Sequence, residues 1–137
     1  MLLSIWSGAH LAQDYASAAV RHFEDAETLR ESGRVDNAGH LIGFAAECAI
    51  KHRISSLRPG ANSPQGHFPE LLIAARKHLG PRSRYTGMYN IVKGDIFRGW
   101  TVNRRYDETG HTNPEDLVEW FAAARRLLAA ASVRTRK

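Results

Sequence analysis

The chain has 137 residues, 43% of them hydrophobic and 24% charged, and its formal net charge is +5. This length and apolar content exclude an intrinsically disordered chain and predict one domain at 1–137, with its core at about 9–132. A single cysteine excludes an internal disulfide and a multi-cysteine zinc site, and with neither a secretory leader nor a membrane-length apolar run we expect a cytoplasmic protein.

The first predicted helix runs from about Ala9 to Glu31. Small and apolar side chains recur along it at helical spacing and form one inward stripe: Tyr15, Ala18, Ala19, His22 or Phe23, Ala26 and Leu29. Ser32 and Gly33 end this helix, since glycine readily takes the left-handed conformation that closes many helices.

The second predicted helix has Asp36 as its N-cap and ends near Ser56, before the loop residues 58–66. Its apolar stripe consists of Ala38, Leu41, Ile42, Ala45, Cys48 and Ala49. Steps of three and four residues place four other side chains together on an adjacent face: His40, Gly43, Glu47 and Lys51.

Glu47 stands beside small residues on this face, where another segment is able to approach closely. A buried carboxylate without a partner is costly, so Glu47 requires a cation or a shifted pKa. We expect it to pair with Arg104 or Arg105 from the far end of the sequence and to fix their loop. The alternative is an exposed ion pair with Lys51, one turn along the same helix.

Three further segments complete the predicted fold. A short helix runs from Pro69 to about His78, whereas residues 82–111 carry apolar side chains at helical spacing but are interrupted by Gly87, Gly94 and Gly99. The last helix follows an Asn113 cap, and its inward stripe is Leu117, Phe121, Ala124, Leu128 and Ala131. Together the segments predict an all-α fold, a four- to five-helix up-and-down bundle.

Positive charge is concentrated in residues 76–105, which hold eight basic side chains and one acidic side chain. Such a block suits a polyanion such as RNA, or alternatively an acidic partner surface. The residues predicted to bind are Arg82, Arg84, Arg98, Glu47 and Lys51. The aromatic rings near the block, Trp100 and Trp120 among them, fit base stacking, but we favour a place in the core.

Arg104, Arg105 and His111 are the candidate catalytic residues. An arginine binds the oxygens of a phosphodiester and stabilises the charge that develops during cleavage, and a histidine transfers a proton to or from the sugar oxygens. The helix that begins near Asn113 adds attraction for anions. The remaining histidines lack metal-ligand spacing, so we expect neither a metal site nor a cofactor.

Three segments of the sequence resemble a known family in both their residues and their order: DAETLRESGRVDNAGHLIGFAAECAIK, GHFPEL and WTVNRRY. They are similar to the bacterial HEPN domains (higher eukaryotes and prokaryotes nucleotide-binding). The resemblance covers roughly residues 10–130, and its most specific part places Asp25, Asn37, Glu47 and Lys51 in the helix-pair pattern of that family.

The resemblance implies a helical bundle of HEPN type, a homodimer with its working cleft between protomers, and in many members a metal-independent endoribonuclease of a toxin–antitoxin system. The family motif is an arginine and a histidine four to six residues apart, which Arg105 and His111 match. Products would carry 2′,3′-cyclic phosphate ends, and a nucleotidyltransferase-type antitoxin is an expected partner. The alternative is a noncatalytic HEPN module that binds a nucleotide, RNA or a partner protein.

Overall fold

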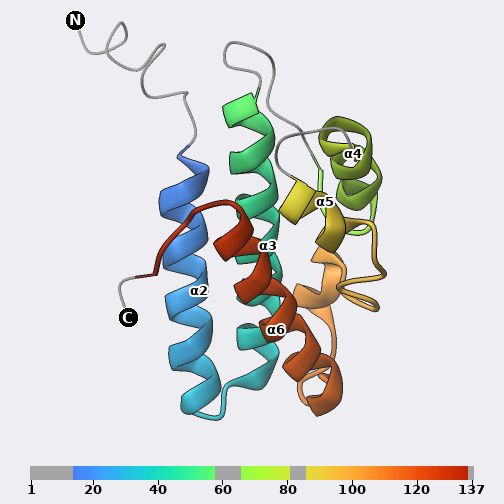
Figure 1. Ribbon diagram of the computed structural model, residues 1–137. Helices are drawn as coiled ribbons and strands as arrows, with labels where there is room; N and C mark the ends of the chain where they lie inside the picture. Colours follow the sequence, from blue (N-terminus) through green and yellow to red (C-terminus); the bar gives the residue numbers. More distant parts are fainter. Residues whose placement is uncertain (1–13, 58–65, 81–85, 136–137) are drawn as a thin grey trace, which may run out of the picture.

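The computed structural model describes residues 14–57, 66–80 and 86–135 (Figure 1). In these ranges the chain forms five α-helices and one 3-10 helix: α2 (Tyr15–Glu31), α3 (Val35–Leu57), α4 (Glu70–Leu79), α5 (Thr86–Val92), η2 (Val102–Tyr106) and α6 (Pro114–Ala130). No strand occurs within them, and the prediction of an all-α helical bundle is confirmed. The predicted helical residues 9–13 lie outside the described ranges.

The helices α2 and α3 form an antiparallel hairpin (Figure 1). Asp14 caps α2 by accepting a hydrogen bond from the Ser17 backbone N–H at 2.9 Å. Gly33 has a φ of +79°, as predicted, and the Arg34 N–H donates to the Leu29 carbonyl at 2.8 Å across the turn. This tight connection lays the two helices side by side along their length.

The predicted N-cap at Asp36 is wrong, because α3 begins one residue earlier, at Val35. Asp36 therefore lies inside the first turn of the helix. Its carboxylate is turned toward the segment that precedes α6, where it accepts hydrogen bonds from Gly110 and Thr112. A short polar side chain at a helix start is able either to cap its own helix or to bind a distant backbone segment, and the sequence pattern does not distinguish the two.

The central helix α3 packs against α2, α4, η2 and α6. Its buried side chains include Ala45, Ala46 and Ala49, whose small size lets neighbouring helices approach closely, and the larger Ile42 and Ile50. On α2 the buried residues are Tyr15, Ala19, Phe23 and Ala26, which all belong to the predicted stripe. The hairpin and α6 thus share one apolar interior.

The chain returns from the end of α3 through α4, α5 and η2, and α6 then runs in the same sense as α3 (Figure 1). Asn113 caps α6 as predicted, accepting from the Glu115 N–H at 2.8 Å. Trp100 and Trp120 are 1% and 3% exposed, so they belong to the core, as we favoured from the sequence. Among the described helices, none is long and apolar enough to cross a membrane.

Candidate functional site

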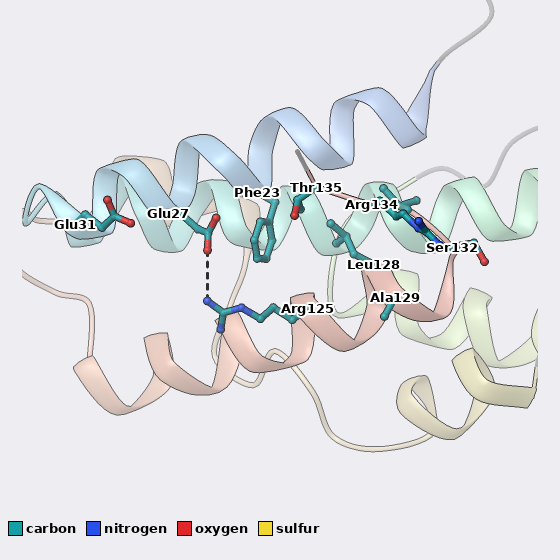
Figure 2. Close-up of a pocket in the computed structure, with 10 residues that line it drawn as sticks. Phe23, Glu27, Glu31, Arg125, Leu128, Ala129, Ser132, Arg134 and Thr135 are labelled. Carbon is teal, nitrogen blue, oxygen red and sulfur yellow. Dashed lines mark hydrogen bonds and ion pairs between the residues drawn. The ribbon is translucent and has the colours of Figure 1, made fainter. Parts of the chain in front are cut away.

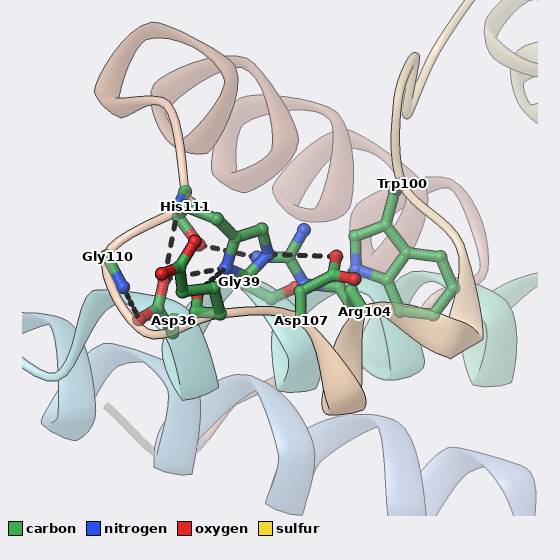
Figure 3. Close-up of polar contacts among 9 residues, drawn as sticks. Asp36, Gly39, Trp100, Arg104, Asp107, Gly110 and His111 are labelled. Atoms are coloured by element: carbon green, nitrogen blue, oxygen red, sulfur yellow. Dashed lines mark hydrogen bonds and ion pairs between the residues drawn. The ribbon is translucent and has the colours of Figure 1, made fainter.

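The segment between η2 and α6 is fixed to the start of α3 by one carboxylate (Figure 3). Asp36 Oδ2 accepts the Gly110 N–H at 2.7 Å, and Oδ1 accepts the Thr112 N–H at 3.2 Å and the Thr112 hydroxyl at 2.5 Å. Gly110 has a φ of +93°, which favours glycine at this turn. These hydrogen bonds lower the pKa of Asp36 and keep it ionised, and the bond from the Thr112 hydroxyl contributes most.

Arg104 is directed inward from η2 and is only 6% exposed. Its Nη2 donates to the Thr112 hydroxyl at 2.7 Å, and its guanidinium lies 4.7 Å from the ring centroid of Trp120. Burial lowers the pKa of this guanidinium, and the nearby carboxylates, Asp36 first, act in the opposite direction. Arg104 therefore connects η2, α6 and the Asp36 carboxylate from within.

His111 lies between two carboxylates at the edge of the same cluster (Figure 3). Its Nδ1 is 2.8 Å from the Glu108 carbonyl oxygen and 3.4 Å from Asp36 Oδ1, and its Nε2 is 3.3 Å from Asp107 Oδ2. The imidazole side chain is 26% exposed and that of Asp107 is 53% exposed. Both ring nitrogens thus face oxygen atoms, and the Asp107 carboxylate beside Nε2 is exposed to solvent.

Arg105 is exposed on the outer side of η2, with its guanidinium 4.9 Å from the ring centroid of Tyr106. No hydrogen bond or ion pair joins Arg105 to His111 in the part of the chain that the structure describes. Five residues separate Arg105 from His111 along this segment, and Asp107 is one of them. Of the two predicted arginines, only Arg105 has a guanidinium available to a ligand.

The predicted pairing of Glu47 with Arg104 or Arg105 is wrong. Glu47 is 3% exposed, and its carboxylate accepts the Phe68 N–H at 2.8 Å and contacts His67 Nδ1 at 2.9 Å. Burial raises the pKa of Glu47, and the two hydrogen bonds oppose that shift. The reason is position along α3: Arg104 packs at Gly39, two turns before Glu47, which faces the segment leading into α4.

A pocket of about 430 Å³ opens between α2 and α3, beyond Glu47. Its walls carry Arg21 and His22 from α2, Phe44 and Lys51 from α3, and His67. Lys51, one of the predicted binding residues, lies 6.0 Å from the ring centroid of Tyr15. Cys48 also lines the pocket, but burial raises the pKa of its thiol to about 11, so it is no nucleophile at neutral pH.

The basic block of the sequence is divided among different tasks. Arg76 donates to the Val92 carbonyl at 2.7 Å and the Gly94 carbonyl at 3.0 Å, which ties α4 to the end of α5. Arg98 is exposed but donates to Asp95 at 2.6 Å, so part of its charge is already compensated. The predicted binding residues Arg82 and Arg84 lie outside the described residues.

A separate groove of about 810 Å³ lies between α2 and α6 (Figure 2). Phe23 and Leu128 form its apolar floor, and Glu27 and Arg125 meet across it at 3.4 Å. None of the predicted site residues that the structure describes lines this groove. In the described ranges, no group of three or more His, Cys, Asp or Glu side chains is arranged to hold a metal ion.

No family model, curated protein or solved structure matches the chain.

Proposed function

We propose that the protein is a metal-independent endoribonuclease of HEPN type, with Arg105, Asp107 and His111 as its catalytic residues. The observation that supports this most is the position of His111, an imidazole held between the carboxylates of Asp36 and Asp107 on the turn that also carries the exposed Arg105. A carboxylate and an imidazole 3.3 Å apart supply one proton acceptor and one proton donor at the same place.

In this proposal the attacking group is the 2′-hydroxyl of the RNA itself. Arg105 binds the non-bridging oxygens of the phosphodiester and stabilises the added negative charge as the 2′-oxygen bonds to phosphorus. Asp107 accepts the proton of the 2′-hydroxyl, and His111 donates its Nε2 proton to the departing 5′-oxygen. The products are a 2′,3′-cyclic phosphate and a 5′-hydroxyl, so neither water nor a metal takes part in the bond change.

Asp36 and Arg104 act as positioning residues in this scheme. The Asp36 carboxylate fixes Gly110 and Thr112 on either side of His111, and Arg104 holds Thr112 from the interior. Their bonds determine where the imidazole stands relative to Arg105. Preorganisation of this kind contributes to catalysis by holding the reacting groups at short range.

The resemblance also supports a homodimer, with the two turns facing a shared cleft, and a nucleotidyltransferase-type antitoxin as the partner that restrains the enzyme. Light scattering on the purified chain tests the first expectation: a mass near twice 15.3 kDa supports it and a mass of 15.3 kDa contradicts it.

A cleavage assay in EDTA tests the proposed activity directly. We expect wild-type protein to cut a mixture of cellular RNAs, and His111→Ala to lose about 100-fold or more of the rate, as general acid–base residues do. Arg105→Ala should lose a similar factor. Arg126→Ala is the matched control, since it removes an exposed arginine from α6. Equal rates for His111→Ala and wild type would refute the assignment.

The second candidate function is a noncatalytic module that binds RNA, a nucleotide or an acidic partner protein. It is favoured by the engagement of Arg104 with Thr112 and by the oxygen atoms that both nitrogens of His111 already face. This alternative predicts salt-sensitive binding without cleavage, lost on reversing Arg98 and Arg105 to glutamate. Cleavage by wild type that His111→Ala abolishes would remove it.

A further inference from the structure

One face of α3 carries aromatic and basic side chains. They extend from the η2 turn, by which we mean residues 104–112, to the α2–α3 pocket. His40, Phe44 and Lys51 recur there at steps of four and seven residues, in line with Asp36 at the helix start. Arg21 and His22 from α2, and His67 before α4, border the same line. We call His40, Phe44, Lys51, Arg21, His22 and His67 the α3 strip.

Ring contacts make the α3 strip continuous. Phe44 stands at its centre, with ring centroids 4.5 Å from His40, 5.7 Å from His22 and 5.9 Å from His67. At the other side His40 stacks on Trp100 with ring planes 17° apart. Three imidazoles around one phenyl ring form a half-exposed aromatic surface, and rings of this kind are platforms for unpaired bases.

His40 connects this surface to the η2 turn. Burial is the main cause that lowers the pKa of His40. The charges of Arg104 and Arg105 lower it further, as do His22 and His67 to a smaller extent. A single imidazole thus lies within electrostatic range of the arginines at one end and of the histidines at the other. Its ring contacts Phe44 on one side and Trp100 on the other, so the α3 strip reaches from the pocket to the segment that leads into η2.

Three acidic groups along the α3 strip are occupied by contacts within the protein, whereas Asp25 on α2 is exposed within electrostatic range of His22. Glu47 is buried against Phe68 and His67, and Asp36 holds Gly110 and Thr112. Asp14 lies at the pocket edge, where its side chain accepts the Ser17 N–H. The cationic groups that reach solvent are Arg105 at one end and Arg21 with Lys51 at the other.

From Asp36 to Lys51 the helix axis is about 22 Å long, at 1.5 Å per residue. That length is comparable with the several-nucleotide sites of proteins that bind single strands. A cationic group at each end and stacking rings between them match a strand of alternating phosphates and bases. A duplex fits less well, because its bases are already stacked on one another.

We propose that single-stranded RNA lies along the α3 strip, with a base against Phe44 and its phosphate on Arg21 and Lys51 in the α2–α3 pocket. This inference rests on the proposed function, since it assigns the part of the substrate that extends away from the scissile phosphate at Arg105 and His111. The pocket then serves as a second subsite that positions the strand for cleavage.

Binding of a labelled 2′-O-methyl RNA 12-mer, followed by fluorescence anisotropy, tests the α3 strip separately from cleavage. This RNA lacks the attacking hydroxyl and stays intact whether or not the protein is an enzyme. We expect the Arg21→Ala/Lys51→Ala variant to bind at least tenfold more weakly and its salt slope to fall by about 1.4, as for two single-strand phosphate contacts. Phe44→Leu should lower the affinity for this RNA about fivefold or more and leave the salt slope unchanged.

Two controls keep this test specific. Lys77→Ala/Arg126→Ala removes two exposed charges from α4 and α6 and should change the affinity less than twofold. Lys51→Arg keeps the charge in the pocket and should retain wild-type affinity. Wild-type affinity in the Arg21→Ala/Lys51→Ala variant would overturn the inference even if the protein cleaves RNA. Conversely, weakened binding without any cleavage of unmodified RNA would contradict only the proposed function.

Discussion

Gly39 and Gly43 leave the space on α3 in which the candidate site is anchored. A Cβ atom on Gly43 would stand 2.0 Å from the Trp100 ring, and one on Gly39 would stand 2.9 Å from Arg104 Nη2. The Trp100 indole N–H also donates to the Gly39 carbonyl at 2.8 Å. These two glycines therefore admit the indole and the guanidinium that bring η2 against α3.

Replacing Gly43 with alanine should destabilise the protein by about 2 kcal/mol, because the indole of Trp100 has to move out of a packed core. Urea unfolding followed by circular dichroism measures the loss. Gly87→Ala is the matched control, since Gly87 lies in α5 with nothing within 4 Å of an added Cβ. There we expect unchanged or slightly higher stability. Equal midpoints for the two variants would contradict the packing described here.

Half-buried histidines give the stability a definite dependence on pH. Burial is the main cause that lowers the pKa values of His22, His40 and His52 from their ordinary 6.5. As the pH falls from 7.5 through 6.5, the unfolded chain binds protons at these positions before the folded chain does, so the free energy of unfolding decreases. The raised pKa of Glu47 acts in the opposite direction, at pH values closer to its ordinary 4.5.

Urea titrations at pH 7.5, 6.5 and 5.5 check this dependence. We expect wild-type stability to fall across the series, and His40→Gln to show a smaller fall because one of the three groups no longer titrates. A profile that rises toward pH 5.5 in wild type would show that the histidines are not held in their neutral form by the fold.

At the scale of elements, the first turn of α3 and the turn before α6 behave as one unit. Asp36 accepts from Gly110 and Thr112, and Arg104 reaches the same threonine from η2. The connection joins positions more than 70 residues apart, and His111 lies inside it. The geometry of the candidate site is thus set by a contact between helices rather than by the turn alone.

Replacing Asp36 with alanine should release this turn. We expect a loss of stability of about 1–3 kcal/mol, because the Gly110 and Thr112 donors lose a charged acceptor, and faster hydrogen exchange at the amides of these two residues. RNA cleavage should fall along with it. Asp25→Ala removes an exposed carboxylate from α2 and should change neither the stability, nor the hydrogen exchange of these amides, nor the cleavage rate. Slow exchange at both amides in Asp36→Ala would mean that the turn is held by other contacts.

Periodicity and capping residues predicted much of the element structure. The hairpin turn at Gly33, the Asn113 cap and the apolar stripes of α2 and α6 follow from short-range patterns, and the structure contains them. The partners of Asp36 and Glu47 did not follow, because each is chosen by residues far along the chain. A backbone N–H, such as that of Phe68, leaves no mark in the sequence as a carboxylate partner.

At the scale of the whole molecule, the fold sorts the basic block into structural and exposed charges. Arg76 and Arg104 serve the interior or neighbouring helices, whereas Arg105 stays outside. The sequence alone treats all of them alike, since burial of a charge depends on the chain that covers it. The α2–α3 hairpin brings the charges of Arg21 and Lys51 to one pocket with the ring of Phe44.

The central claim is that the protein cleaves RNA through attack by the RNA's own 2′-hydroxyl, with Arg105 and His111 acting on the phosphate. The most direct measurement is mass spectrometry of the ends formed when unmodified RNA is incubated with protein in EDTA. We predict 2′,3′-cyclic phosphate ends with wild type and their disappearance with His111→Ala. Intact RNA with wild type, or the same cyclic ends in equal yield from His111→Ala, would contradict the claim.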